Sequence, residues 1–332
     1  MLFNKEMFIL KNKKRILITA GGTLITYHIC KIANEYFKDD LLVEIVDTNP
    51  EYLVPASTLA YKTHLVPLSN DKNYTSIIKH IIEEENIDVF IPLLPEELIV
   101  FSKDSFFTKT DKFLMVAPDA RTVKRFADKF ELFKTLEENN IPSPLVFSKP
   151  SSILMDSYYI VKPRFGFGSQ KVSVLKGQEI INDANRFFNN TDFIVQEYCM
   201  SNDYDEVTVE VFNYNGDPRI IARRRLATKS GVCVKTELVD NSLFIDTIKV
   251  LVNKYDLPIV FNVQFLYHSG LWKLFDFNLR LAAGTPLSTA AGFQLTRAFL
   301  SYLLGKEVDE SLFNIDKSIK SILRVYEEIV IK

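Results

Sequence analysis

The segment YYIVKPRFGFGSQKVSVL, from Tyr158 to Leu175, joins a lysine to a glycine-rich loop. The pattern predicts a strand that ends with Lys162, a loop that contains Gly166, Gly168 and Ser169, and a returning strand. Backbone N–H groups of such a loop can face an anion without obstruction by side chains, so the segment suits a polyphosphate. A P-loop has its lysine after the glycines and leads into a helix, which is a different arrangement. A β-hairpin with a flexible glycine turn and a solvated lysine is the alternative.

A second segment, from Asn262 to Arg280, has the pattern of a β-hairpin with oxygen-bearing side chains on one face. Asp276 and Asn278 are two residues apart, so their side chains leave the same face of a strand. With a three-residue turn from Ser269 to Leu271, Gln264 lies opposite Asp276, at the roughly 5 Å of a cross-strand pair. The converging oxygens suit Mg²⁺, with positions left for substrate phosphates. The solvent-exposed face of an ordinary antiparallel hairpin alternates in the same way and is the alternative.

Two weaker patterns lie between these segments. Gln196 and Glu197 end a predicted strand before a polar connection, which could present backbone groups to a flat base while a later carboxylate binds ribose hydroxyls. Arg223, Arg224 and Arg225 end the strand-like run PRIIA. Alternation places Arg223 and Arg225 on one face, where they could hold phosphate or carboxylate through paired hydrogen bonds. A charged strand edge explains the arginines equally well.

The elements that must position these residues are of two kinds. Up to about Pro118, buried-strand runs alternate with helical patterns, which is typical of a parallel, doubly wound α/β sheet. Ligands of such sheets bind beyond the carboxyl ends of the strands, where the Gly21-Gly22 turn, Asp47 and the pair Glu96-Glu97 are predicted to lie. The predicted strands cover 15–20, 42–47, 62–66 and 87–92, and the predicted helices cover 26–37 and the region around 77–82.

Beyond Pro118 the pattern favours short antiparallel strands and a few helices, an α+β arrangement. A helix that includes Phe126 is predicted to end at Asn139-Asn140. A chain of 332 residues is expected to form two or three domains. The predicted strands cover 158–162, 171–175, 193–198, 207–212, 260–267 and 271–277, and further helices are predicted at 179–188 and 295–304.

Composition disfavours several classes of protein. Lysine and arginine number 40 against 42 acidic residues, so no overall field favours nucleic acid or an anionic membrane. Cys30, Cys199 and Cys233 lie far apart, without the spacing of a zinc site or a disulfide framework. The apolar patch near the N-terminus is too short for a signal-peptide core, and no apolar stretch approaches the roughly 20 residues that span a bilayer. We therefore expect a cytoplasmic protein that binds neither nucleic acid nor a membrane.

In order and spacing these segments resemble the ATP-grasp superfamily, and within it the single-copy proteins similar to one ATP-binding half of the carbamoyl-phosphate synthetase large subunit. The resemblance spans about residues 14–305. ADKFELFKTLEENNIPSP resembles the family's DK…L…IPxP opening, and YYIVKPRFGFGSQKV resembles its lysine and glycine-rich loop. FIVQEY resembles the hinge strand, RRRL the arginine segment, and NVQF with LFDFNLRLAAG the metal segment. VDTNPE and IDVFIPLLPEEL resemble the preceding pre-ATP-grasp domain.

The resemblance implies a pre-ATP-grasp doubly wound sheet followed by a two-subdomain ATP-grasp fold with antiparallel sheets. It divides the chain into a Rossmann-like domain at 14–118, a small lid subdomain with a linker helix at 119–200, a large subdomain with the metal site at 201–305, and a C-terminal extension at 306–332.

The resemblance also implies roles for individual residues. The lysines Lys129 and Lys162 would contact ATP phosphates, and Gly166, Gly168 and Ser169 would lie on the lid. Adenine would be held by Gln196, Glu197, Tyr198 and Cys199, and the ribose by Glu206, with Asp203 or Asp205 as the other candidates. Gln264, Asp276 and Asn278 would hold Mg²⁺ or Mn²⁺. Lys162, Arg225 and Arg280 would be catalytic, and Glu97, Arg225 and Arg280 would contact the substrate.

The implied reaction is ATP- and Mg²⁺-dependent formation of an amide from a small carboxylate and an amine, through an acyl phosphate. A single ATP-grasp unit favours an amino acid, peptide or sugar acid over complete carbamoyl-phosphate synthesis, and a homodimer is compatible with it. Departures from the family pattern favour an alternative, a non-catalytic ATP-binding or regulatory relative: the metal-binding glutamate is Asp276, the proline of NPR is Leu279, and the acidic residue before EL is Pro95. A Rossmann oxidoreductase is disfavoured because AGGTLITYH lacks the GxGxxG spacing.

Overall fold

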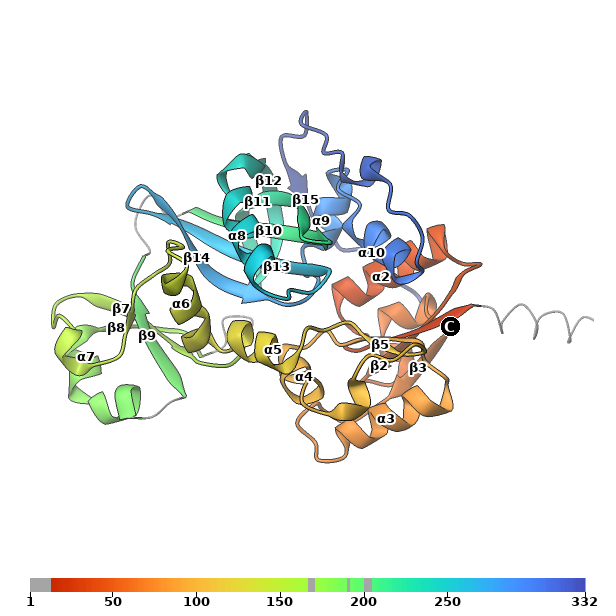
Figure 1. The fold of residues 1–332 in the computed structure, drawn as a ribbon, viewed down its shortest axis with the longest axis horizontal. Helices are drawn as coiled ribbons and strands as arrows, with labels where there is room; N and C mark the ends of the chain where they lie inside the picture. Colours follow the sequence, from red (N-terminus) through yellow and green to blue (C-terminus); the bar gives the residue numbers. More distant parts are fainter. Residues whose placement is uncertain (1–12, 167–170, 190–191, 200–204, 332) are drawn as a thin grey trace, which may run out of the picture. The chain divides into compact units, whose positions relative to one another are not determined.

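The computed structural model describes residues 13–166, 171–189, 192–199 and 205–331. These residues form two compact units (Figure 1). Unit 1 consists of the described residues of Met1–Asp119, Arg280–Asp316 and Arg324–Lys332, and unit 2 consists of those of Ala120–Leu279 and Lys317–Leu323. The finer division predicted from the sequence, into 14–118, 119–200, 201–305 and 306–332, stays a prediction.

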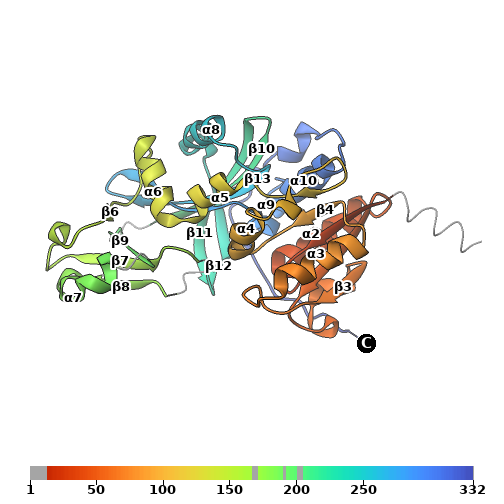
Figure 2. The ribbon, with the colours of Figure 1, turned by 60° about the horizontal axis from the view of Figure 1, so that its bottom comes forward.

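Unit 1 is built on a parallel sheet in the strand order β3-β2-β1-β4-β5, which confirms the parallel sheet expected from the sequence. Strand β2 is buried along its whole length, as expected for a strand covered on both faces. Helix α3 lies against the sheet (Figure 2). Its Ile78 and Ile81 belong to one hydrophobic cluster with Leu17 and Phe90 of the sheet. The elements are β1 (Lys14–Ile18), α2 (Leu24–Tyr36), β2 (Leu41–Asp47), β3 (Lys62–Leu65), α3 (Tyr74–Glu84), β4 (Val89–Ile91), α4 (Pro95–Phe101), β5 (Leu114–Met115), α9 (Thr285–Ala290) and α10 (Leu295–Leu303), with short 3-10 turns at 51–53, 55–58, 105–107 and 310–313.

The glycine turn after β1 is closed by β2. The N–H of Gly21 donates to the carbonyl oxygen of Val46 at 2.9 Å, and the N–H of Gly22 donates to the carboxylate of Asp47 at 2.6 Å. A Cβ atom at Gly22 would meet that carboxylate at 3.2 Å, which explains the small residue there. Thr23 then caps α2.

Unit 2 contains two antiparallel sheets, as the sequence predicted for this part of the chain. The larger has the strand order β14-β13-β10-β11-β12-β15, and the smaller has the order β6-β9-β7-β8. The strands are β6 (Val146–Phe147), β7 (Tyr158–Pro163), β8 (Ser173–Lys176), β9 (Phe193–Glu197), β10 (Asp205–Tyr214), β11 (Asp217–Lys229), β12 (Val232–Val239), β13 (Val260–His268), β14 (Leu271–Asn278) and β15 (Ile322–Leu323). The helices are α5 (Ala120–Ala127), α6 (Lys129–Glu138), α7 (Gly177–Asn182) and α8 (Ile245–Lys254), with a π turn at 185–189 and 3-10 turns at 150–152 and 241–243.

Three sequence predictions for unit 2 need correction. The single helix around Phe126 is two helices, because Asp128 ends α5 and caps α6 through the N–H of Phe130. The helix expected at 179–188 is a short α-helix followed by a separate π turn. The arginines at 223–225 do not end a strand, because β11 continues through them to Lys229 and pairs with strands on both sides.

Among the described residues, the structure contains no helix with the length and apolar character needed to span a bilayer.

Candidate functional site

Two lysines of unit 2 interact electrostatically with the carboxylate of Asp276. Lys162, near the end of β7, is 7% exposed, and its Nζ atom lies 3.4 Å from the carbonyl oxygen of Phe275 and 5.0 Å from the ring centroid of Phe133. Burial lowers the pKa of Lys162 to about 8 against the attraction of Asp276, and the charge of Lys129 adds to the effect of burial. Burial also lowers the pKa of Lys129, again opposed by Asp276. Both ammonium groups therefore gain from an additional negative charge at this position.

Asp128 fixes the position of Lys129. Its carboxylate holds Arg164 by two hydrogen bonds of 2.6 and 2.7 Å and accepts the N–H of Phe130 at 3.0 Å. The backbone N–H of Lys129 donates to the carbonyl oxygen of Arg164 at 3.1 Å, and its Nζ donates to the carbonyl oxygen of Gly166 at 2.8 Å. The start of α6 is thus joined to the chain that leaves β7, which places the two lysines in one region.

The hairpin of β13 and β14 brings Gln264 directly opposite Asp276, as the sequence predicted. The turn has two residues rather than three, with φ of 52° at Ser269 and 82° at Gly270. The strand pairing then shifts by one residue at Phe275, which restores the register expected for the longer turn. The predicted pair is correct, although the predicted turn is wrong.

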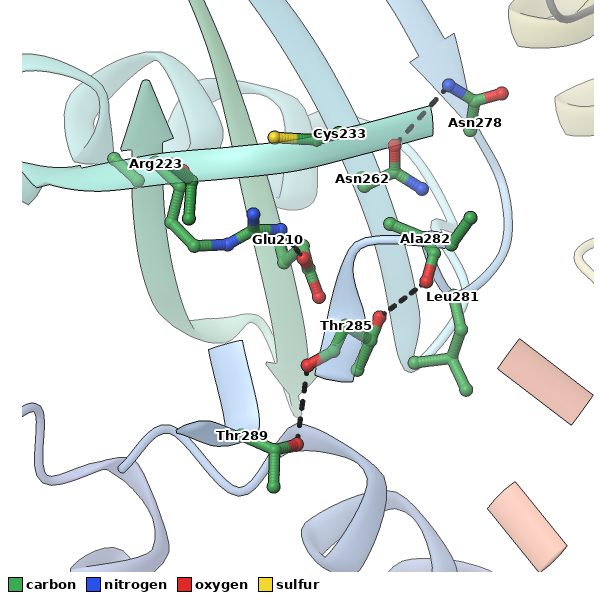
Figure 3. A network of polar contacts seen from close by, with 12 residues as sticks. Glu210, Arg223, Cys233, Asn262, Asn278, Leu281, Ala282, Thr285 and Thr289 are labelled. Carbon is green, nitrogen blue, oxygen red and sulfur yellow. Dashed lines mark hydrogen bonds and ion pairs between the residues drawn. The ribbon is translucent and has the colours of Figure 1, made fainter. Parts of the chain in front are cut away.

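Asp276 and Asn278 share one face of β14. The Nδ2 atom of Asn278 donates to Oδ2 of Asp276 at 2.9 Å. It also donates to Oδ1 of Asn262 at 3.4 Å (Figure 3). A carboxylate and two amide side chains therefore stand on neighbouring strands, and their oxygens are the ligand type that Mg²⁺ and Mn²⁺ prefer. The donor set fits such a cation, and the binding of a metal by Gln264, Asp276 and Asn278 stays a prediction.

Polar side chains continue across the same face of the larger sheet. Cross-strand pairing aligns Asp276, Gln264, Thr208 and Arg223 in one row and Asn278, Asn262 and Glu210 in the next. We call these seven residues the polar face. Arg223 and Glu210 are fully buried and form an ion pair (Figure 3).

Sequence reasoning missed three members of the polar face, Thr208, Glu210 and Asn262. A signal existed for Asn262, because it lies two residues before Gln264 in the otherwise apolar run VFNVQFLY and therefore on the same face. Arg223 was predicted to hold phosphate or carboxylate, but the carboxylate that it holds is that of Glu210.

Two other predicted residues, Glu206 and Arg225, contact each other. Arg225 Nη1 lies 3.0 Å from Glu206 Oε1, and its Nη2 donates to the carbonyl oxygen of Gly231 at 2.9 Å. The neighbouring Arg224 instead binds Asp205 at 2.7 Å, together with Glu237. Alternation along β11 therefore separates Arg225 from Arg224, as predicted.

The end of β9 carries the residues predicted to surround a base. The carboxylate of Glu197 accepts Lys273 Nζ at 2.7 and 2.8 Å and the N–H of Leu145 at 3.0 Å. Burial acts to raise the pKa of Glu197, but these hydrogen bonds outweigh it and hold the pKa below its usual value. Lys273 was missed, because it meets Glu197 across 76 positions of the chain, from a strand of the other sheet.

The neighbouring residues complete this region. Gln196 and Cys199 are buried, and the Tyr198 ring lies 6.1 Å from that of Tyr158. Burial raises the pKa of the Cys199 thiol to about 12, so it stays protonated at neutral pH. Glu197, Cys199 and His268 have the donor atoms of a metal site, but Lys273 already lies against two of them. In unit 1, the similar group of Glu44, His64 and Glu85 is paired with Arg15 and Lys62.

Two predicted substrate residues belong to unit 1. Glu97 is 2% exposed, and its carboxylate accepts Thr19 Oγ1 at 2.6 Å, the N–H of Leu94 at 3.1 Å and the hydroxyl of Tyr74. Burial raises the pKa of Glu97 despite these hydrogen bonds. Arg280 Nη1 donates to the carbonyl oxygen of Leu281 at 2.9 Å. Their contact with a substrate stays a prediction, and Gly168, Ser169 and Asp203 lie outside the described residues.

Comparison with known families gives two matches. Residues 189–323 match the family described as "ATP-grasp in the biosynthetic pathway with Ter operon". Residues 16–113 match the family described as "PylC-like, N-terminal domain". No curated protein shows significant sequence similarity to the chain.

Solved structures share the architecture over most of the chain. The biotin carboxylase domain of Hydrogenobacter thermophilus 2-oxoglutarate carboxylase, solved with MgADP, ADP and bicarbonate, is 12% identical with a TM-score of 0.69, covering 92% of this chain and 72% of that one. N5-carboxyaminoimidazole synthetase from Staphylococcus aureus is 12% identical with a TM-score of 0.66, covering 89% and 78%. Carboxyaminoimidazole ribonucleotide synthase from Aspergillus clavatus, complexed with ATP, is 13% identical with a TM-score of 0.67, covering 92% and 80%.

Proposed function

We propose that this chain, whose fold is that of the ATP-grasp superfamily, is an ADP-forming ligase that uses ATP and Mg²⁺ to join a small carboxylic acid to an amine. The observation that carries the proposal is the buried Lys162, whose Nζ lies 3.4 Å from the carbonyl oxygen of Phe275, next to Asp276. Asp276 stands beside Asn278 and opposite Gln264, and its charge acts on both Lys162 and Lys129. Cations and an oxygen-rich metal site in one place suit a triphosphate with its metal ion. The relatives solved with MgADP and with ATP support this choice of ligand.

Each group has a separate task. Lys129 and Lys162 bind phosphate oxygens and neutralise charge on the transferred phosphoryl group. Gln264, Asp276 and Asn278 would hold Mg²⁺, which when bound neutralises further charge on the phosphates. Because burial lowers the pKa of both lysines, a bound phosphate would favour the charged form of each one.

The end of β9 would hold the nucleoside. The Glu197 carboxylate is engaged by Lys273 and by the N–H of Leu145, so we assign adenine recognition to the backbone of residues 197–199 rather than to that carboxylate. Glu206, at the start of β10, would accept the ribose hydroxyls while keeping its contact with Arg225.

The chemistry that follows is a two-step displacement. A carboxylate oxygen of the acid attacks the γ-phosphorus of ATP, the bond to the β–γ bridging oxygen breaks, and ADP leaves. The amine nitrogen then attacks the carbonyl carbon of the acyl phosphate, phosphate leaves with the bonding electron pair, and the nitrogen loses a proton. Arg225 and Arg280 are our candidates to hold the acid and the acyl phosphate.

We choose candidate substrates by analogy with the similar proteins. The family that matches 189–323 is described by a biosynthetic pathway, and one relative was solved with bicarbonate as a domain dimer. We therefore include bicarbonate with amino acids, peptides and sugar acids as candidate acids, and we propose a homodimer. We also propose a kinship with the single-copy proteins similar to half of the carbamoyl-phosphate synthetase large subunit, which the two family matches leave unspecified.

Trapping of the acyl phosphate tests the reaction. The protein is incubated with Mg-ATP, hydroxylamine and a panel of these acids, and hydroxamate and ADP are measured; for bicarbonate, ADP release alone is followed. We expect equal amounts of hydroxamate and ADP with one class of carboxylic acid, or ADP release that depends on bicarbonate. Lys162→Ala should lose whichever activity the wild-type protein shows. Formation of AMP and pyrophosphate would replace this mechanism with adenylation.

A non-catalytic ATP-binding protein is the second candidate, and the shorter carboxylate at Asp276 with Leu279 after Asn278 favours it. Such a protein would bind Mg-ATP tightly and release no ADP with any acid of the panel. The activity of Asp276→Glu distinguishes a degenerate site from a tuned one.

A further inference from the structure

The amide of Asn278 has two ends that face different neighbours. Its Nδ2 atom donates to Oδ2 of Asp276 at 2.9 Å and to Oδ1 of Asn262 at 3.4 Å. Figure 3 shows the nitrogen turned toward Asn262 and the oxygen on the opposite side of the amide. The oxygen is the atom that a hard cation would bind, so the orientation of this amide decides whether Asn278 is a ligand.

Asn262 contributes to the orientation of the Asn278 amide, and its own position is fixed by strand pairing and burial. It stands directly opposite Asn278 in the pairing of β13 with β14, it is 3% exposed, and β13 is an interior strand of the sheet. If the Asn278 amide turned by half a rotation, its oxygen would face both the Asp276 carboxylate and the Asn262 carbonyl oxygen. Three acceptors would then meet without a proton between them, which is unfavourable because Asn262 is buried and its acceptor would lose its donor.

We propose that Asn262 is a positioning residue for the cation site: its Oδ1 accepts Nδ2 of Asn278 and thereby presents Oδ1 of Asn278 to Mg²⁺. The inference rests on the proposed function, because the cation concerned is the one that accompanies ATP. It assigns a role to Asn262 that acts through Asn278 rather than through direct contact with the metal. Outer hydrogen-bond partners of metal ligands typically change metal affinity about 10- to 100-fold when they are removed.

Binding of Mn²⁺ in the presence of ADP tests the proposal without turnover, since the EPR signal of free Mn²⁺ falls as the ion is bound. We expect Asn262→Leu to weaken Mn²⁺ binding by about tenfold. Asn262→Asp, which keeps an acceptor at the same place, binds Mn²⁺ no more weakly than the wild-type protein. Asn213→Leu is the matched control, because Asn213 lies on β10 and its amide donates to the carbonyl oxygen of Leu257 at 3.3 Å. It should leave Mn²⁺ binding unchanged.

A double-variant cycle separates positioning from direct ligation. If Asn262 acts through Asn278, then Asn262→Leu has no further effect on Mn²⁺ affinity in an Asn278→Leu background. Additive losses would show that Asn262 binds the metal itself and would overturn the proposal. Should Asn262→Leu fail to fold, Asn262→Thr carries the same expectation, because its hydroxyl is too short to reach Asn278.

Failure of the proposed function can be distinguished from failure of the role of Asn262. A wild-type protein that binds no Mn²⁺ with ADP overturns both the proposed function and this inference. A wild-type protein that binds Mn²⁺, with an Asn262→Leu variant of equal affinity, overturns only the role of Asn262. Unchanged ADP affinity in EDTA shows that each variant keeps its nucleotide site.

Discussion

Lys162 and Asp276 come from different sheets of unit 2, yet the Asp276 carboxylate offsets part of the burial that lowers the pKa of Lys162 to about 8. The pair has an immediate consequence for pH dependence. Below about pH 8 the ammonium group is charged and attracts phosphate, and as the pH rises through 8 it loses its proton. In unfolded chains a lysine keeps its proton to about pH 10.4, so this loss is a property of the fold.

We therefore expect ATP affinity to fall as the pH rises above about 8. Calorimetric titration from pH 7 to 9.5 measures it. Lys162→Arg keeps its charge over this range and should remove the decline, whereas Lys162→Met should bind weakly at every pH. An equal decline in wild type and Lys162→Arg would assign the titration to another group, such as Lys129.

Asp276→Ala should abolish the Mg²⁺ dependence of nucleotide binding, because it would remove the charged ligand of the proposed triplet and the acceptor for Asn278. The free energy of unfolding should change by less than about 1 kcal/mol, as for a side chain that faces a site rather than the core. A larger loss of stability with intact Mg²⁺ dependence would make Asp276 structural.

Asp276→Glu is the companion variant. The hydrogen bond to Asn278 at 2.9 Å sets the reach of the natural carboxylate, and an additional methylene displaces it. If the shorter side chain is tuned to this site, activity decreases. An increase would identify the natural protein as a degenerate member of its fold family.

Glu206→Gln should weaken ATP binding by about tenfold, since a hydrogen bond to a charged group contributes about 1.5–3 kcal/mol. The same variant should bind 2′,3′-dideoxy-ATP as well as the wild type does, because the hydroxyls concerned are absent. Asp205→Asn is the matched control, since Asp205 binds Arg224 rather than Arg225. A loss in Asp205→Asn instead would move the ribose contact to that residue.

Arg223→Leu should destabilise the fold by about 3–5 kcal/mol, because it leaves the fully buried Glu210 without its counter-charge. Urea denaturation measures the change. The double variant Arg223→Leu, Glu210→Leu should recover most of the loss, since no buried charge remains. A double variant as unstable as the single one would show that the network around the pair, rather than its charge balance, stabilises the sheet.

The sequence predicted what depends on local pattern. The alternation in LFDFN placed Asp276 and Asn278 on one face, and apolar runs located most strands of both units. Gln264 was correctly predicted to lie opposite Asp276, although the predicted turn was one residue too long. The shorter turn changes the register by one residue, and the shift at Phe275 changes it back. Turn length and strand irregularities together set the register of a hairpin, so the sequence pattern does not reveal two changes that compensate for each other.

What the sequence could not predict depends on pairing between distant segments. Lys273 meets Glu197 across 76 positions of the chain, and Arg223 meets Glu210 only because β10 and β11 align them. A buried charged side chain has the same sequence pattern as an exposed one until its partner strand is known. Glu97 illustrates the same limit, since its position beyond a strand suggested a ligand but its carboxylate is enclosed by Thr19, Tyr74 and Leu94.

Calorimetric titration with nucleotides measures whether the site binds ATP together with Mg²⁺. The wild-type protein is titrated with ATP in Mg²⁺, with ATP in EDTA and with NAD in Mg²⁺, and Asp276→Ala is titrated with ATP in Mg²⁺. We expect tight binding only of ATP with Mg²⁺ to the wild-type protein, with weaker binding in EDTA and to Asp276→Ala. Binding of NAD in preference to ATP, or ATP binding that is unaffected by both EDTA and Asp276→Ala, would contradict this expectation.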